Sequence, residues 1–193
     1  MRIVAGLKRG KILNTPTDDK TRPTSDRARE ALFNILNAIL LKEKKQWKDI
    51  TFLDVFAGTG AVGLEALSRG AKESLFIENH PPALACLKSN ASDFENAHIM
   101  MCDATCPPYT TRPMNIIFMD APYREELWEK ALMALSNKGW IDEKTLVIVE
   151  IEKKEENILP AGFKLLDDRI YGRNRLLFCK KARETKEASM VTF

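Results

Sequence analysis

Four acidic residues, Asp54, Glu78, Asp103 and Asp120, each stand at or just after the end of a predicted apolar strand. Ligands of open α/β sheets bind outside the carboxyl ends of the strands, so we expect these side chains to meet at one edge of a sheet. Glu78 lies 18 residues after Gly60, a distance that suits a carboxylate binding the hydroxyls of a ribose. Asp103 could accept a hydrogen bond from an adenine amino group. The edge therefore predicts a nucleoside-containing cofactor.

The stretch from Thr51 to Gly63, TFLDVFAGTGAVG, predicts a buried strand, a glycine turn and the start of a helix. Such a turn lets backbone N–H groups face a ligand at close range, which side chains at Gly58 or Gly60 would block. The glycine spacing also fits the dinucleotide fingerprint, so the turn alone does not choose a cofactor. We expect the Asp54 carboxylate, aimed into the turn, to suit a cationic amino group and to repel a pyrophosphate. That favours S-adenosylmethionine over a nicotinamide dinucleotide.

The segment Asp120-Ala121-Pro122-Tyr123, at the end of a later strand, indicates chemistry on an amino group. The exocyclic amine of a base is a poor nucleophile because its lone pair is delocalised into the ring. Acceptance of its N–H groups by the Asp120 carboxylate and the Ala121 carbonyl would favour a tetrahedral nitrogen with a directed lone pair. Pro122 stiffens the turn, and Tyr123 offers a ring on which a flipped base can stack. These four candidate catalytic residues would act by positioning and electrostatics, without a covalent intermediate.

The net charge of +3 is concentrated near the N-terminus. Residues 1–30 hold eight Lys and Arg against four Asp and Glu, and the rest of the chain is close to neutral. A basic arm on a neutral body indicates a polyanionic partner. The candidate RNA-binding residues belong to this arm: Lys8, Arg9, Lys11 and Arg22.

Length and composition are ordinary for a globular protein, and 193 residues predict a single domain spanning 1–193. No apolar run approaches the roughly 18 residues of a membrane span, and no signal-peptide pattern opens the chain. The four cysteines form no CxxC pair, and neither histidine has ligand spacing with them. We therefore expect reduced thiols, no metal site, no membrane partner and a cytoplasmic monomer.

The elements that must position these residues alternate between strand and helix. After the glycine turn and a helix through Ser68, apolar strands and helices follow one another along the chain. The predicted strands are 52–56, 74–78, 97–101, 114–120 and 145–151, and the predicted helices between them include 81–94 and 124–136. Continuous apolar strands that alternate with helices indicate a parallel sheet covered on both faces. Residues 164–171 and 175–180, around Gly172, predict a closing antiparallel pair.

The N-terminal region predicts three further parts. Residues 1–23 form a basic arm, and two short apolar pieces around the tip Lys8–Lys11 indicate a small hairpin or an extended arm. Thr24 or Ser25 can cap an amphipathic helix whose apolar residues, from Ala28 to Leu40, recur on one face. The α/β core is predicted to occupy 24–180, and residues 181–193 to form a frayed tail.

Motifs along most of the chain resemble those of one enzyme family. DVFAGTG at 54–60, the acids at Glu78 and Asp103, and DAPY at 120–123 resemble an amino-methyltransferase with the (D/N)PP(Y/F) motif. RIVAGLKRG at 2–10 and TRPTSDRAREALFNIL at 21–36 make the combination similar to the bacterial 16S ribosomal RNA guanine-N2 methyltransferase family. The resemblance covers residues 2 to about 180.

This resemblance implies a Rossmann-like class I methyltransferase, an α/β fold with a seven-stranded, mostly parallel sheet and a reversed last strand. It implies S-adenosylmethionine as the cofactor and one guanine of the small-subunit RNA, naked or in an assembling particle, as the substrate. It also places the basic arm at RNA and the Thr21–Pro23 segment near the cofactor and target entrance. The candidate cofactor contacts are Thr21, Asp54, Phe56, Ala57, Gly58, Thr59, Gly60, Glu78, Asn79, Asp103 and Ala104.

One residue departs from the family pattern, because Ala121 stands where the family has proline. The carbonyl is retained, so the acceptor geometry can survive in a looser turn, and we expect activity that is intact or modestly reduced. An inactive copy that only binds RNA stays open.

Other readings of the same motifs also stay open. Adenine and cytosine present an NH2 group to the same acceptors, and so does a protein glutamine, although the basic arm argues against a protein substrate. A nicotinamide-dependent oxidoreductase could use the same glycine turn. Asp54 disfavours it, and no Tyr-x-x-x-Lys or similar acid/base pair stands out.

Overall fold

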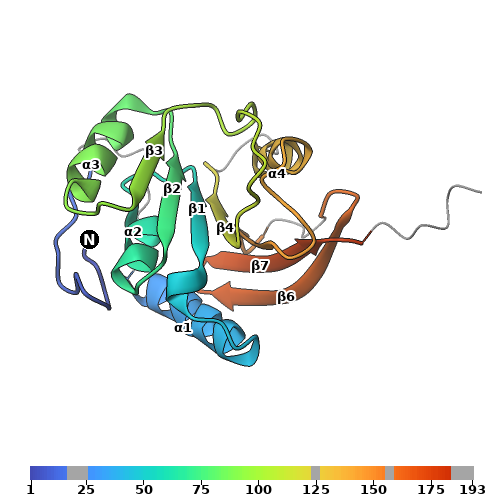
Figure 1. The fold of residues 1–193 in the computed structure, drawn as a ribbon, viewed down its shortest axis with the longest axis horizontal. Coiled ribbons are helices and arrows are strands. Elements are labelled where there is room, and N and C mark those ends of the chain that lie inside the picture. Colours follow the sequence, from blue (N-terminus) through green and yellow to red (C-terminus); the bar gives the residue numbers. More distant parts are fainter. Residues whose placement is uncertain (17–25, 123–126, 155–158, 184–193) are drawn as a thin grey trace, which may run out of the picture.

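A computed structural model describes residues 1–16, 26–122, 127–154 and 159–183, and every structural statement below concerns these residues. Seven strands form one sheet in the order β3-β2-β1-β4-β5-β7-β6 (Figure 1). The strands are β1 Thr51–Val55, β2 Glu73–Ile77, β3 Ala97–Met100, β4 Ile116–Asp120, β5 Leu146–Glu152, β6 Phe163–Tyr171 and β7 Asn174–Lys181. Strands β1 to β5 are parallel, whereas β7 runs antiparallel between β5 and β6. The predicted seven-stranded sheet with a reversed last strand is thus confirmed.

The apolar runs form the centre of the sheet because both of their faces are covered. Every residue of β5 except its last is buried, and β1 and β4 are buried in the same way. Predicted and observed strand bounds differ by one or two residues. The predicted tail begins one residue too early, because β7 extends through Lys181.

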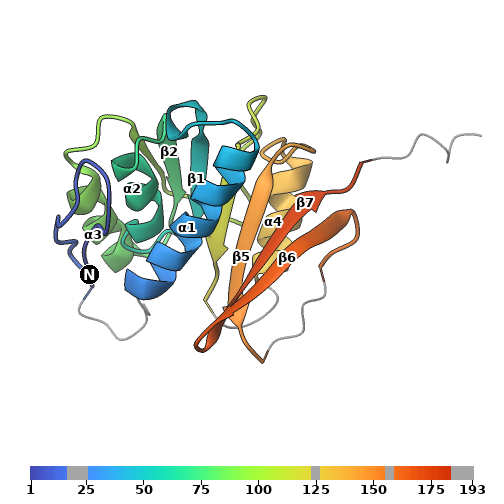
Figure 2. The same ribbon diagram turned by 90° about the horizontal axis from the view of Figure 1, so that it is seen from below.

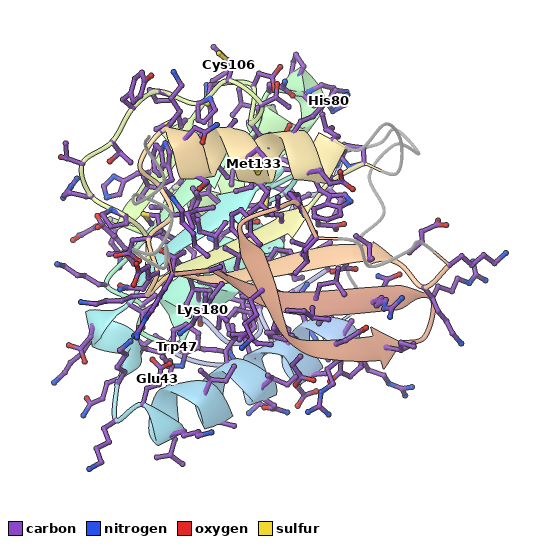
Figure 3. The ribbon with its side chains drawn as sticks, turned by 90° about the vertical axis from the view of Figure 1, so that its right-hand side faces the viewer. Glu43, Trp47, His80, Cys106, Met133 and Lys180 are labelled. Carbon is purple, nitrogen blue, oxygen red and sulfur yellow. The ribbon has the colours of Figure 1, made fainter. Side chains whose placement is uncertain are left out.

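Three helices cover one face of the sheet and a fourth covers the other. The first three are α1 Asp26–Lys42, α2 Ala61–Ser68 and α3 Pro81–Ala91, which lie together in front of the sheet in Figure 2. Their buried residues join one core cluster, and those of α4 Leu127–Asn137 join a second. Figure 3 shows Met133 of α4 on one side of the sheet and Glu43 and Trp47, near the end of α1, on the other. A 3₁₀ turn, Trp47–Asp49, interrupts the connection into β1.

Helix α1 buries the leucines of the predicted apolar face, leaves its alanines and isoleucines half-buried, and also buries two residues that the prediction omitted. Leu32, Leu36 and Leu40 are buried, and so are Arg29 and Phe33. The Phe33 ring packs against the ring of Phe52 in β1, with centroids 6.4 Å apart. The predicted capping residues of this helix lie outside the described residues. Helix α3 ends three residues earlier than predicted.

The start of the N-terminal arm folds as a hairpin, which is the first of the two predicted forms. Arg2 pairs with Ile12 in an antiparallel bridge, and the Ile3 N–H donates to the Lys11 carbonyl at 2.9 Å. Ile3 and Leu13 are buried in the first core cluster, so the hairpin is packed onto the sheet domain. In the described residues, no helix combines the length and apolarity that crossing a membrane requires.

Candidate active site

The glycine turn between β1 and α2 is held in a left-handed backbone conformation. Phe56, Gly58 and Gly60 have φ angles of 59°, 56° and 79°. Phe56 is the only one of these three that is not glycine, so its positive φ is strained. Strained backbone of this kind concentrates at functional sites. A Cβ added at Gly58 would meet no atom within 4 Å, so the backbone there faces open space. At Gly63 an added Cβ would lie 2.4 Å from the Phe76 ring, so this glycine lets α2 pack closely against β2.

Glu78, at the end of β2, binds the glycine turn directly. Its Oε2 accepts the Gly58 N–H at 2.7 Å, and its Oε1 accepts the N–H groups of Asn79 and His80 at 2.9 and 2.7 Å. The side chain is buried. A carboxylate therefore already occupies a turn N–H that a pyrophosphate would need, and its charge would repel a phosphate placed there.

Asp54 lies beneath the turn and not at its mouth. It is buried, and its Oδ2 accepts the Gly63 N–H at 2.8 Å. Burial raises the pKa of Asp54 to about 8, with a smaller contribution from the nearby Glu78 and against the Gly63 hydrogen bond, which lowers it. A carboxyl with that pKa is largely protonated at neutral pH. Asp54 therefore anchors the start of α2 and is not aimed into the turn as the sequence predicted, whereas Glu78 is the carboxylate that contacts the turn itself.

The other candidate cofactor residues take ordinary roles in the two loops around the turn. Ala57 donates its N–H to the Ile77 carbonyl at 3.0 Å, and the Thr59 carbonyl accepts from the Asn90 amide at 3.0 Å. Asp103 is exposed, and its Oδ1 accepts the N–H and the hydroxyl of Thr105, both at 2.8 Å. Ala104 is buried in the second core cluster. Thr21 lies outside the described residues.

The predicted amine-acceptor segment begins at Asp120, the last residue of β4, which is the neighbour of β1. Val55 pairs with Met119 in the sheet, so the glycine turn and Asp120 begin at adjacent strand ends. Asp120 is half-buried and Pro122 exposed. Ala121 is buried in the second core cluster, so the residue that replaces the family proline contributes to apolar packing. Tyr123 lies outside the described residues.

Sequence reasoning missed a fifth acid at this edge, Glu150, which lies within β5 level with the last residue of β4. This residue pairs with Asp120 across the sheet, and the Asn174 amide donates to its Oε1. Glu150 is only 4% exposed, and burial raises its pKa to about 6 while the Asn174 hydrogen bond opposes the rise. The same rule that selected Asp54, Glu78, Asp103 and Asp120 applies to Glu150. It escaped notice because apolar residues flank it on both sides, in VIVEIE.

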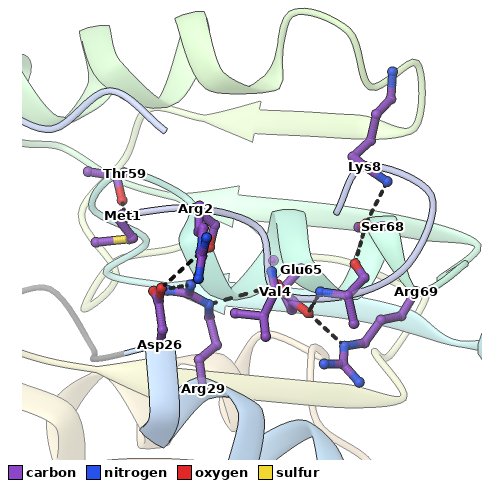
Figure 4. A network of polar contacts seen from close by, with 12 residues as sticks. Met1, Arg2, Val4, Lys8, Asp26, Arg29, Thr59, Glu65, Ser68 and Arg69 are labelled. Carbon is purple, nitrogen blue, oxygen red and sulfur yellow. Dashed lines mark hydrogen bonds and ion pairs between the residues drawn. The ribbon is translucent and has the colours of Figure 1, made fainter. Parts of the chain in front are cut away.

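The basic hairpin is fixed to α2 by a buried carboxylate, Glu65. Figure 4 shows its contacts: the Val4 and Ala5 N–H groups donate to it at 2.7 and 3.0 Å, and Arg69 Nε donates at 2.8 Å. Arg29 Nε lies 3.9 Å from the same carboxylate, and both side chains are fully buried.

Further along the hairpin, Gly6 lies against the end of α2. The Leu7 N–H donates to the Ser68 carbonyl at 2.7 Å. A Cβ at Gly6 would fall 1.9 Å from that carbonyl oxygen, so only glycine permits this approach. The hairpin is therefore positioned relative to the glycine turn, because α2 connects the two.

The predicted RNA-binding residues are partly engaged within the protein. Lys8 Nζ lies 3.2 Å from an oxygen of Asp93, and Lys11 pairs with the other oxygen of that carboxylate. These lysines lower the pKa of Asp93, Lys11 most strongly. Arg9 is exposed at the tip of the hairpin, and Arg22 lies outside the described residues. In the described part of the chain, no group of three or more His, Cys, Asp or Glu side chains could hold a metal ion.

Comparisons with known proteins agree with this arrangement. Residues 1–180 match the family described as conserved hypothetical protein 95. The ribosomal RNA small subunit methyltransferase D of Escherichia coli is 33% identical over 177 residues, which span 90% of this chain and 86% of that protein. The Haemophilus influenzae protein of the same name is 33% identical over 179 residues, 89% of each chain.

Solved structures extend the comparison to the fold. A putative methyltransferase from E. coli superposes with a TM-score of 0.77 at 33% identity, covering 94% of this chain and 97% of that one. A putative RNA methyltransferase from Pyrococcus horikoshii has a TM-score of 0.68 at 17% identity, which supports the class I methyltransferase fold alone. The match over residues 1–180, with one third of positions identical to the E. coli enzyme over nine-tenths of the chain, shows that this chain belongs to the conserved hypothetical protein 95 family, as its resemblance to small-subunit ribosomal RNA methyltransferases predicted.

Proposed function

We propose that this protein uses S-adenosylmethionine to methylate the exocyclic N2 amine of a guanine in small-subunit ribosomal RNA. The observation that carries the proposal is the adjacency of two parts. The glycine turn after β1 and the amine-acceptor segment Asp120–Pro122 after β4 stand at neighbouring strand ends, in register. A cofactor bound at the turn and a base held at Asp120 would therefore be close enough to react.

The residues around the turn fit S-adenosylmethionine, which carries a ribose and an adenine but no phosphate. Glu78 already satisfies the Gly58 N–H, and Asp54 satisfies the N–H of Gly63 at the start of α2. Both donors would otherwise favour a phosphate. The carboxylates thus support the proposal over a nicotinamide dinucleotide, and we expect Glu78 and Asp103 to hold the ribose and the adenine. When bound, this cofactor supplies an electrophilic methyl group on a sulfonium.

The chain's own contribution to the reaction is the orientation of the amine. Asp120 and the Ala121 carbonyl would accept the two N–H groups, so that the nitrogen lone pair points toward the turn. Donors and acceptors fixed before the reaction cost no reorganisation during it, which makes electrostatic positioning the main source of rate. The attacking amine becomes cationic and acidic as it takes up the methyl group, and its proton would then pass to the Asp120 carboxylate that accepts the N–H.

A ribosomal RNA partner is supported by the curated relatives, which are named as ribosomal RNA small subunit methyltransferases, and by the basic hairpin. Arg9 stands exposed at its tip, where a phosphate can approach. With such a substrate we expect this protein to act in the cytoplasm, on naked RNA or on an assembling small subunit. We expect it to act as a monomer.

Transfer of labelled methyl from S-adenosylmethionine to unmodified small-subunit RNA and to small-subunit particles tests the proposal. Nucleoside analysis should find the label in N2-methylguanine. Asp120→Ala should abolish transfer and keep cofactor binding, which calorimetry can measure. Label in an adenine or cytosine amine would keep the mechanism and reject guanine. Absence of label, despite cofactor binding, would favour an inactive RNA-binding protein and attribute the loss to Ala121.

A further inference from the structure

We infer that Glu150 reads the guanine, by accepting the N1–H that lies beside the reactive amine on the base. The inference rests on the proposed function and explains how that site would distinguish guanine from the other bases that carry an amine. It assigns a specificity role to a residue outside the DAPY segment.

The sheet places Glu150 beside Asp120. The two are register partners on β4 and β5, so their backbones lie about 5 Å apart and their side chains leave the same face. Two residues earlier, Phe118 and Ile148 are also register partners, and both join the core cluster under α1, α2 and α3. A base whose amine reaches Asp120 would therefore present its neighbouring edge to Glu150.

The ring atom beside the amine differs between the bases, and this difference can distinguish guanine from adenine and cytosine. In guanine the amine-bearing carbon lies between two ring nitrogens, and one of them, N1, carries a hydrogen while the other, N3, has a lone pair. In adenine and cytosine the corresponding ring nitrogen beside the amine carries a lone pair instead. A carboxylate accepts from the first and is repelled by the other two, and enzymes that act on flipped bases read such Watson–Crick edges. Asp120 alone accepts an amine from any of the three.

The surroundings of Glu150 prepare one of its oxygens for this role. The Asn174 side-chain amide donates a hydrogen bond to Oε1 of the Glu150 carboxylate. That bond orients the carboxylate and leaves Oε2 as the acceptor for a donor on the base. The side chain is 4% exposed, so water competes little for the oxygen. Ionisation above its raised pKa of about 6 keeps it an acceptor at neutral pH.

The test compares two RNA substrates that differ at the target base. One carries guanine, and the other carries 2-aminopurine, which retains the 2-amine but has a lone pair at N1. The wild-type protein should prefer guanine. Glu150→Gln should lower that preference about 10- to 100-fold, because the amide loses the charge-assisted hydrogen bond and can donate to the N1 lone pair. Glu73→Gln is the control. It also removes one negative charge, but at the start of β2, the end away from the proposed site, and it should leave the preference unchanged.

Three readouts keep the outcomes distinct. S-adenosylmethionine binding and thermal unfolding verify that each variant is folded. Asn174→Ala, which removes the orienting donor and keeps Glu150, should lower the preference by a smaller factor. A wild-type preference retained in Glu150→Gln would overturn the role of Glu150 alone. Failure of the wild-type protein to form N2-methylguanine would overturn the proposed function as well.

Discussion

Replacement of Glu65 by glutamine tests whether the hairpin is held by a buried charge. The wild-type carboxylate accepts hydrogen bonds from Val4, Ala5 and Arg69 and lies near Arg29, with no exposed surface. Glutamine has the same shape but only one acceptor oxygen and no charge. At least one hydrogen bond to a charged group is lost, worth about 1.5–3 kcal/mol.

The lost charge adds to this cost, because Arg29 stays buried after its partner is neutralised. Breaking a buried ion pair from one side costs about 3–5 kcal/mol. Asp26 limits the loss here, since its Oδ1 accepts from Arg29 Nη2 at 2.9 Å and remains in the variant. We therefore expect Glu65→Gln to lower the free energy of unfolding by about 3 kcal/mol. For a chain of this size that corresponds to a fall in Tm of roughly 6–12 °C.

Urea unfolding and amide hydrogen exchange measure this effect and locate it. Exchange at Val4, Ala5 and Leu7 should accelerate more than exchange in β1, because the hairpin loses its attachment before the sheet opens. Glu43→Gln is the matched control: its carboxylate is partly exposed and pairs with Lys45 and Lys180 at 2.7 and 3.7 Å. Exposed pairs contribute about 0–1 kcal/mol. Equal destabilisation by the two variants would refute the reasoning.

Two further predictions concern pH and salt. The pKa of Asp54 is about 8 in the folded chain, above its ordinary value of 3.8. Between these pH values the folded chain keeps a proton that the unfolded chain gives up. The contribution of Asp54 to stability therefore falls as the pH rises through this range. Asp54→Asn should flatten that decline in urea unfolding between pH 5 and pH 8, and parallel declines would contradict it. Arg9→Glu should reduce the salt slope of RNA binding by about one unit, more than Lys8→Glu, because Lys8 is already paired with Asp93. An unchanged slope for Arg9→Glu would remove the hairpin tip from the RNA interface.

The alternation of strands and helices could be predicted because the central strands are buried on both faces and therefore read as unbroken apolar runs. The group that a carboxylate side chain contacts could not be predicted in the same way. The sequence places Asp54 before the glycine turn, but its partner is the N–H of Gly63, nine residues later, and only the folded turn brings them together. Glu65 was missed for a related reason. A charged residue in a short helix reads as solvent-facing until a hairpin from the N-terminus covers it.

The strand order separates the carboxyl groups at this edge into two sets. Asp54 lies near the end of β1, and Glu78 and Asp103 follow β2 and β3; each accepts an N–H of the chain. Those bonds fix the loops and leave little room for a phosphate. Asp120 ends β4 and Glu150 lies beside it in β5, on the other side of β1, where no glycine turn lies between them. Since adjacent parallel strands hold them about 5 Å apart, the two can accept neighbouring donors of one planar base. Guanine offers such donors at N1 and N2, and this match makes the β4–β5 side of the sheet the place where the target would be chosen.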